Sequence, residues 1–180
     1  MKVTGVKREH FNALRRLDNL PFSVSRSTNA PKWQEFSIDD AFRLRIMLEL
    51  LGSVTANESG SGLLPSFAAK AVNNAIGKSD VGSSIDAFRT VPSDHYLGFG
   101  FFEEVSPGCE PLRYSQWFCE PLDGIAEWRN LQIEKAKQES NADAQLVRIV
   151  MVNASAAARE IYRRASDLGL LDEYEPSADA

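Results

Sequence analysis

The hydrophobic positions of the first fifty residues recur at the three- and four-residue spacing of helices. Residues 6–17 show this spacing, and Pro21 ends it because proline disfavours helical geometry in the residue before it. Residues 37–51 show the spacing again, starting at a capping box in which the Ser37 hydroxyl and the Asp40 carboxylate each accept a backbone N–H of the other residue. The pattern therefore predicts two helices separated by a polar loop.

The next stretch of the chain alternates between polar segments and one further helix. Residues 52–62 are small and polar, which predicts a flexible insertion. Residues 63–76 have helical periodicity, with Pro65 near the first turn, where proline is tolerated because no N–H is needed there. Residues 79–92 are predicted to be an interdomain linker.

After residue 92 the hydrophobic period changes from that of helices to that of strands. Gly98 and Gly100 indicate a bulge in the first strand or a close approach of another chain. The predicted elements are, in order, strands at 96–105 and 112–118, a helix at 124–140, a strand at 145–152, and a helix that Asn153 or Ser155 caps and that runs towards Leu168. The order β-β-α-β-α is typical of a small α+β domain.

These patterns predict an α+β protein with a mostly helical head followed by a partner or dimerisation domain. The head spans residues 1–78, the linker residues 79–92 and the second domain residues 93–172. Residues 173–180 form an acidic tail.

The helix predicted at residues 6–17 has one polar and one apolar face. The residues that can face a core are Phe11, Leu14 and Leu17. The polar residues at i, i+4, i+7 and i+8 are Arg8, Asn12, Arg15 and Arg16. Arginine can contact guanine O6 and N7, and asparagine can contact adenine N6 and N7, so this face has the chemistry to read bases. The same spacing is also typical of a solvated helix face.

Two stretches of the first half resemble the MerR family of winged helix-turn-helix regulators. They are TGVKREHFNALRRLDNLP and, after the loop, WQEFSIDDAFRLRIM. In that family a Thr-Gly-Val turn leads into the recognition helix, a leucine-proline pair ends it, and a hairpin wing precedes the next helix. The resemblance implies a winged helix-turn-helix head, in which the helix at 6–17, beginning with Lys7 and Arg8, reads the major groove of double-stranded DNA. It also implies a wing at 23–36 that contacts phosphates through Arg26 and Lys32.

The chain departs from the family at positions that contact DNA. Gln34 replaces the wing arginine, and the sequence FNAL at 11–14 replaces Leu-Arg-Tyr-Tyr in the recognition helix. Only three residues precede the Thr-Gly-Val turn, where the family has a first helix. The alternative to a DNA-binding regulator is therefore a protein-interaction module that keeps the winged-helix scaffold without binding DNA.

The distribution of charge fits a basic head on an acidic partner domain. The chain of 180 residues has a formal net charge of −5. Residues 1–50 hold nine Lys and Arg against six Asp and Glu, a net charge of +3, and the remaining 11 and 19 give −8. Phosphate contacts need local cations and not a basic protein as a whole, so this asymmetry is compatible with DNA binding. A three-charge excess is also small enough to arise by chance.

Several classes of protein are not favoured by the sequence. No apolar run reaches the length of a membrane span, so we expect a cytoplasmic protein that does not contact membranes. Cys109 and Cys119 lack the Cys-x-x-Cys spacing, and we expect free thiols without a disulfide, a metal or a cofactor.

A catalytic site would have to combine His95 with Cys109 or Cys119, as in a small hydrolase or transferase. Nothing in the sequence brings these residues together, and Cys119 alternates in step with Trp117, which predicts that the two pack side by side. We therefore expect a regulator and not an enzyme, with double-stranded DNA as its partner. Residues 93–172 are available for a homodimer or a protein partner.

Overall fold

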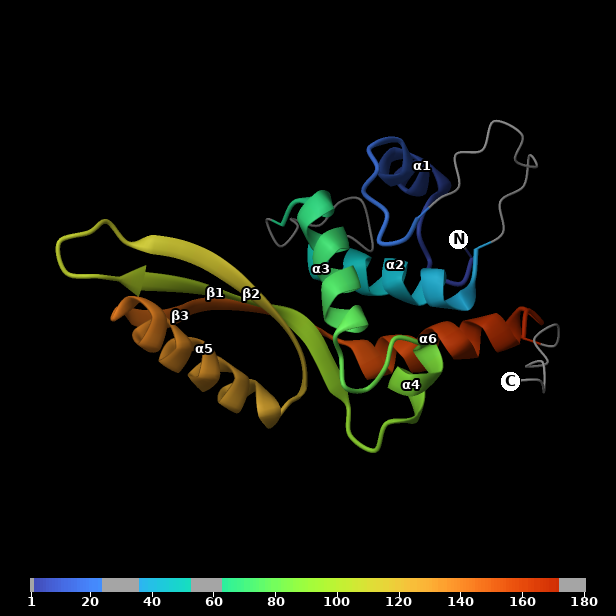
Figure 1. Ribbon diagram of the computed structural model, residues 1–180. Coiled ribbons are helices and arrows are strands. Elements are labelled where there is room, and N and C mark those ends of the chain that lie inside the picture. Colours follow the sequence, from blue (N-terminus) through green and yellow to red (C-terminus); the bar gives the residue numbers. More distant parts are fainter. Residues whose placement is uncertain (1, 24–35, 53–62, 172–180) are drawn as a thin grey trace.

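The computed structural model describes residues 2–23, 36–52 and 63–171 (Figure 1). Within these ranges the chain forms six helices and three strands. In chain order they are α1 (Arg8–Arg16), α2 (Ile38–Leu51), α3 (Pro65–Gly77), α4 (Ile85–Thr90), β1 (His95–Val105), β2 (Leu112–Pro121), α5 (Gly124–Ser140), β3 (Asp143–Asn153) and α6 (Ala154–Asp167). The elements from β1 onwards follow the expected order β-β-α-β-α, and the fold is α+β.

The three strands form one antiparallel sheet in the order β2-β1-β3. The register of β1 against β3 shifts between Phe101 and Phe102, so that Val147 of β3 is the extra residue of a bulge. Gly98 lies away from this shift, at a point where an added Cβ would overlap the backbone oxygen of Val150. Gly98 therefore marks a close approach of β3, and the bulge lies elsewhere.

Helix α5 covers one face of the sheet (Figure 1). Trp128 of α5 packs with Phe102 and Phe118 in a cluster on this face. Gly100 of β1 makes room for the indole, because a Cβ at that position would lie 2.6 Å from Trp128 Cη2. The opposite face meets α3 at one end only, and the sheet extends beyond α3 towards the hairpin turn (Figure 1).

One hydrophobic core joins the helices before residue 92 to the sheet and to α6. Phe42 of α2, Phe99 of β1 and Ile161 of α6 are fully buried members of this core. Helix α6, from the end of the chain, packs on both α2 and α4. The two predicted domains therefore share their largest buried cluster.

The segment predicted as a linker, residues 79–92, contributes helix α4 to the core. Ile85 and Phe88 are buried, and the Phe88 ring lies 5.3 Å from that of Phe42 in α2. The Asp39 carboxylate of α2 accepts the backbone N–H of Ile85 at 2.6 Å. These contacts attach α4 to α2.

Local helix signals are placed as the sequence predicts. Ser37 Oγ accepts Asp40 N at 3.0 Å and Asp40 Oδ2 accepts Ser37 N at 3.1 Å, which confirms the capping box of α2. Asn153 caps α6 by accepting Ala156 N at 2.8 Å. Of the two predicted caps of α6, Ser155 has another role, because its buried hydroxyl accepts the backbone N–H of His95 at 3.0 Å.

Candidate nucleic-acid interface

Helix α1 lies at one edge of the molecule, well away from the hairpin turn of the sheet (Figure 1). Phe11 and Leu14 are buried in the main core, as predicted, together with Val6 in the turn before the helix. The Phe11 ring also meets the Phe36 ring edge-on, with centroids 5.4 Å apart. The apolar side of α1 is thus anchored, and its opposite side is open to solvent.

We call the cations and the asparagine of α1, together with Lys7 at its N-cap, the α1 basic face. They are Lys7, Arg8, Asn12, Arg15 and Arg16; Asn12 is partly buried and the other four are exposed. Among the residues that the structure describes, these four cations form no ion pair. Glu9 is exposed on the same helix and offsets one of the four charges. An excess of positive charge therefore faces solvent on an anchored helix.

The end of α1 differs from the prediction. The helix ends at Arg16, and Leu17, which was predicted to face the core, is 69% exposed. The chain leaves the helix through a left-handed residue, Asp18 with φ 59°, and Asn19 N donates to Leu14 O at 2.9 Å. The prediction for Leu17 was wrong because the helical period no longer applies once the chain turns out of the helix.

The predicted wing, residues 23–36, lies almost wholly outside the described residues, and so do Arg26 and Lys32. Its two ends are described. The Phe22 and Phe36 rings lie 5.6 Å apart, and Phe36 contacts Phe11 of α1. Phe36, the last residue of the predicted wing, therefore lies beside α1.

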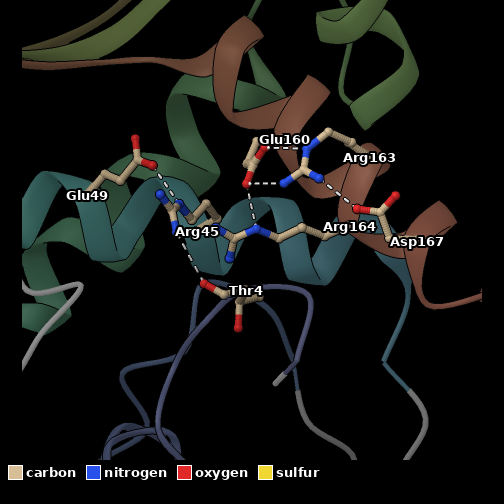
Figure 2. A network of polar contacts seen from close by, with 7 residues as sticks. All are labelled: Thr4, Arg45, Glu49, Glu160, Arg163, Arg164 and Asp167. Carbon is tan, nitrogen blue, oxygen red and sulfur yellow. Dashed lines mark hydrogen bonds and ion pairs between the residues drawn. The ribbon is translucent and has the colours of Figure 1, made fainter.

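A polar network holds the turn that leads into α1, as Figure 2 shows. Arg45 of α2 donates Nη1 to the backbone oxygen of Thr4 at 3.4 Å, and its Nε pairs with Glu49 Oε1 at 2.5 Å. Arg164 of α6 reaches the same turn, since its Nη1 would lie 3.1 Å from a Cβ added at Gly5. The sequence does not predict that either arginine reaches this turn, because they come from helices that begin about 30 and 150 residues further along the chain.

Glu160 and Arg163 of α6 form the second part of this network. Glu160 accepts hydrogen bonds from Arg163 and from Arg164, the latter at 2.6 Å, and these bonds lower the pKa of Glu160 to about 2. Arg163 also pairs with Asp167 at 2.6 Å. The side chain of Arg164 is thereby oriented along α6 towards the turn before α1 (Figure 2).

The histidine and cysteines considered for catalysis are placed apart or in unreactive surroundings. His95 begins β1 and Cys109 lies in the hairpin turn beyond its other end, and β1 spans about 33 Å at the usual rise per residue. Cys119 packs beside Trp117 against the main core, and burial raises the pKa of its thiol to about 11. A thiol with so high a pKa holds almost no nucleophilic thiolate at neutral pH.

Other chemistry is sparse in the described ranges. Cys109 and Cys119 are both free thiols. Within these ranges no three His, Cys, Asp or Glu side chains are grouped so as to hold a metal ion, and no helix is long and apolar enough to cross a bilayer. No protein-family model, curated protein or solved structure matches the chain.

Proposed function

We propose that this protein is a DNA-binding transcriptional regulator that reads the major groove with α1. The observation that carries the proposal is the α1 basic face, in which exposed cations and an asparagine share one side of a helix anchored by its other side. A helix about 10–12 Å wide fits the major groove, which is about 12 Å wide. The winged helix-turn-helix resemblance of the sequence points to the same helix.

Individual residues of the face have different roles in this proposal. Arg8 and Asn12 contact base edges, guanine and adenine respectively, and so supply sequence preference. Lys7 contacts phosphate and supplies affinity without sequence preference. Arg26 and Lys32, in the predicted wing that ends at Phe36, add phosphate contacts.

A nine-residue helix can contact only a few DNA bases. We therefore infer that two copies of the protein act together on DNA. Dimeric helix-turn-helix proteins bind half-sites about 34 Å apart, one turn of the duplex. The residues from 93 onwards are proposed to supply the contact between copies. The proposal predicts a recognition sequence with two-fold repetition.

Selection of bound duplexes from a random DNA pool tests the proposal directly. The full chain is used at about 0.15 M salt, which suppresses nonspecific phosphate binding. We expect enrichment of one motif, repeated about its centre. Folded protein that enriches no motif would contradict the proposal.

Variants then test the assignment of α1. Arg8→Ala and Asn12→Ala should each weaken binding to the selected site by about 1–3 kcal/mol and relax the preference at one base pair. Lys7→Ala should weaken binding to all duplexes alike and reduce its salt dependence. Lys70, exposed on α3 and outside residues 93–172, provides the control, and Lys70→Ala should leave affinity unchanged. Equal losses for Arg8→Ala and Lys70→Ala would show that α1 is not the DNA-contacting helix.

A protein-interaction module without DNA binding is the second candidate. Leu17, exposed at the end of α1, and the partly exposed Phe36 beside the helix favour it, because apolar side chains suit a protein contact better than a phosphate backbone. Two results together would support this candidate over the regulator. The protein would retain a purified partner protein and lose it in the Leu17→Asp variant, and it would show no salt-sensitive affinity for DNA.

A further inference from the structure

Two arginines from distant helices meet at the turn that leads into α1 (Figure 2). Arg45 of α2 donates Nη1 to the backbone oxygen of Thr4 at 3.4 Å. The position that a Cβ would take at Gly5 lies 3.1 Å from Arg164 Nη1 and 3.9 Å from Arg45 Nη1. Gly5 also has φ 75°, a backbone conformation that glycine adopts most readily. Both guanidinium groups therefore lie against the backbone of one turn, at a residue without a side chain.

Each of these guanidinium groups is oriented by a glutamate on its own helix. Arg45 Nε donates to Glu49 Oε1 at 2.5 Å within α2. Arg164 Nε donates to Glu160 Oε1 at 2.6 Å within α6. The side chains of Arg45 and Arg164 are 16% and 33% exposed, so both are partly buried. Because the guanidinium is a rigid planar fork, a glutamate that binds Nε also sets the direction of the terminal nitrogens.

The network around the turn has no excess of positive charge. On α6, Arg163 donates to Glu160 at 3.0 Å and pairs with Asp167 at 2.6 Å. Together with the two pairs above, three arginines are matched by three carboxylates (Figure 2). Phosphate binding depends on uncompensated cations, such as those of the α1 basic face. The network is therefore suited to fixing the backbone of the turn and not to binding phosphate.

The turn is joined directly to the first residues of α1. Thr4 is 2% exposed, and its Oγ1 accepts the backbone N–H of Val6 at 3.3 Å. Val6 is buried in the main core, and α1 begins two residues later, at Arg8. A shift of the turn would therefore also move Arg8. Binding groups need to be held within about 0.5 Å and roughly 10–20° of their productive geometry, so a small shift is enough to weaken recognition.

We propose that Arg164 is a positioning residue for DNA recognition, and this proposal rests on the function proposed above for α1. With Arg45, it fixes the turn before α1 and thereby the direction in which the helix presents Arg8 and Asn12 to the major groove. Arg164 itself does not contact the DNA. The orientation of the reading helix then depends on α6, the last helix of the chain.

Hydrogen exchange of the full chain, measured without DNA, tests the contact with the turn. The variant is Arg164→Met, which removes the guanidinium and keeps an apolar stem for packing. Arg163→Met is the matched control, because Arg163 binds the same Glu160 but otherwise pairs along α6. In Arg164→Met we expect the amides of residues 5–7 to exchange about tenfold faster and those of α5 to be unchanged. Exchange at residues 5–7 that equals that of Arg163→Met would overturn the proposal.

Affinities for the selected duplex and for an unrelated duplex distinguish positioning from direct contact. We expect Arg164→Met to bind the selected duplex about tenfold more weakly, to bind the unrelated duplex as the native chain does, and to keep the native salt dependence. Loss of a phosphate contact would instead weaken both duplexes and reduce the salt slope by about one. That result, or equal losses for both duplexes without a change in slope, would overturn the proposal. Arg164→Lys keeps the charge without the planar fork, so it should recover little of the loss.

The positioning proposal and the DNA-binding proposal can fail separately. If the native chain selects a DNA motif, but Arg164→Met leaves both exchange and selectivity unchanged, only the positioning proposal fails. If Arg164→Met speeds exchange at residues 5–7, but the native chain selects no motif, the DNA-binding proposal fails. The role of Arg164 in recognition is then refuted with it, and its contact with the turn is retained.

Discussion

Cys119 of β2 is a partly buried thiol with an altered acidity. Its side chain packs against the main core, and burial raises the pKa of the thiol from 9.0 to about 11. Above pH 9 the unfolded chain loses the thiol proton while the folded chain retains it. The stability that the neutral thiol contributes is therefore present below pH 9 and is lost as the pH rises through 11, by roughly 2 kcal/mol.

Urea unfolding at a series of pH values, from about 8 to about 11, measures this loss. Other groups titrate in the same range, so the comparison is between the native chain and Cys119→Ala, which should lack this part of the pH dependence. Cys109→Ala, in the exposed hairpin turn, should behave like the native chain. Identical pH profiles for the native chain and Cys119→Ala would show that the thiol is not the cause.

The residues of α1 show which side-chain positions a periodic pattern can predict. Phe11 and Leu14 are buried as expected, because the helix continues on both sides of them. Leu17 has the same spacing and is exposed, because the left-handed Asp18 turns the chain away from the core. The helical spacing of hydrophobic residues therefore predicts burial only for residues inside the helix, and not for those after its end.

At the level of elements, the start of α2 joins a local signal to a tertiary contact. The capping box of Ser37 and Asp40 fixes the first turn of the helix. Phe36 immediately precedes the cap and packs against Phe11 of α1 and against Phe22. The residue before the cap therefore also contacts α1.

Ser37→Ala should destabilise the protein by about 1 kcal/mol, because Asp40 N loses its side-chain acceptor. Chemical denaturation measures the change. Ser66, exposed in the first turn of α3, is the control, and Ser66→Ala should change stability by less than about 0.5 kcal/mol. If Ser37→Ala is as stable as Ser66→Ala, water hydrogen-bonds the backbone N–H of Asp40 as well as the Ser37 hydroxyl does.

Elements of the second half could be predicted because their signals are local. Alternating hydrophobic residues around a Pro-Gly turn predict the hairpin, and Asn153 predicts the start of α6. The α+β class and the order β-β-α-β-α follow from these signals. Helix α4 was not predicted, since six residues are too few to show a period.

On the scale of the whole molecule, the main core spans both halves of the chain. Helix α6 covers α2 and α4, and the buried Ala157 and Ile161 belong to the same cluster as the head helices. In addition, Arg164 reaches the turn before α1 (Figure 2). The head is therefore completed by a helix from the end of the chain.

A chain of residues 1–78 alone should consequently lack a cooperative thermal transition, because the α2 surface that α6 covers would be exposed to water. Circular dichroism during heating, compared with the full chain, measures this. In the full chain, Ile161→Ala should lower stability by about 2–5 kcal/mol and weaken amide protection in α2 as well as in α6. A fragment that melts as sharply as the full chain would show that the head folds independently.

The sequence by itself determined the helices with capping signals, the strands and their order, and the basic and apolar faces of α1. These depend on residues a few positions apart, whose geometry the local backbone sets. Only the tertiary structure decided that helix α4 of the 79–92 segment belongs to the core and that Phe67, Phe101 and Arg148 line one groove. It also decided that Arg45 donates to the turn before α1 and that Arg164 lies beside that turn. Such contacts join segments up to about 160 residues apart, and no local period or spacing records which apolar surfaces will cover one another when the chain folds.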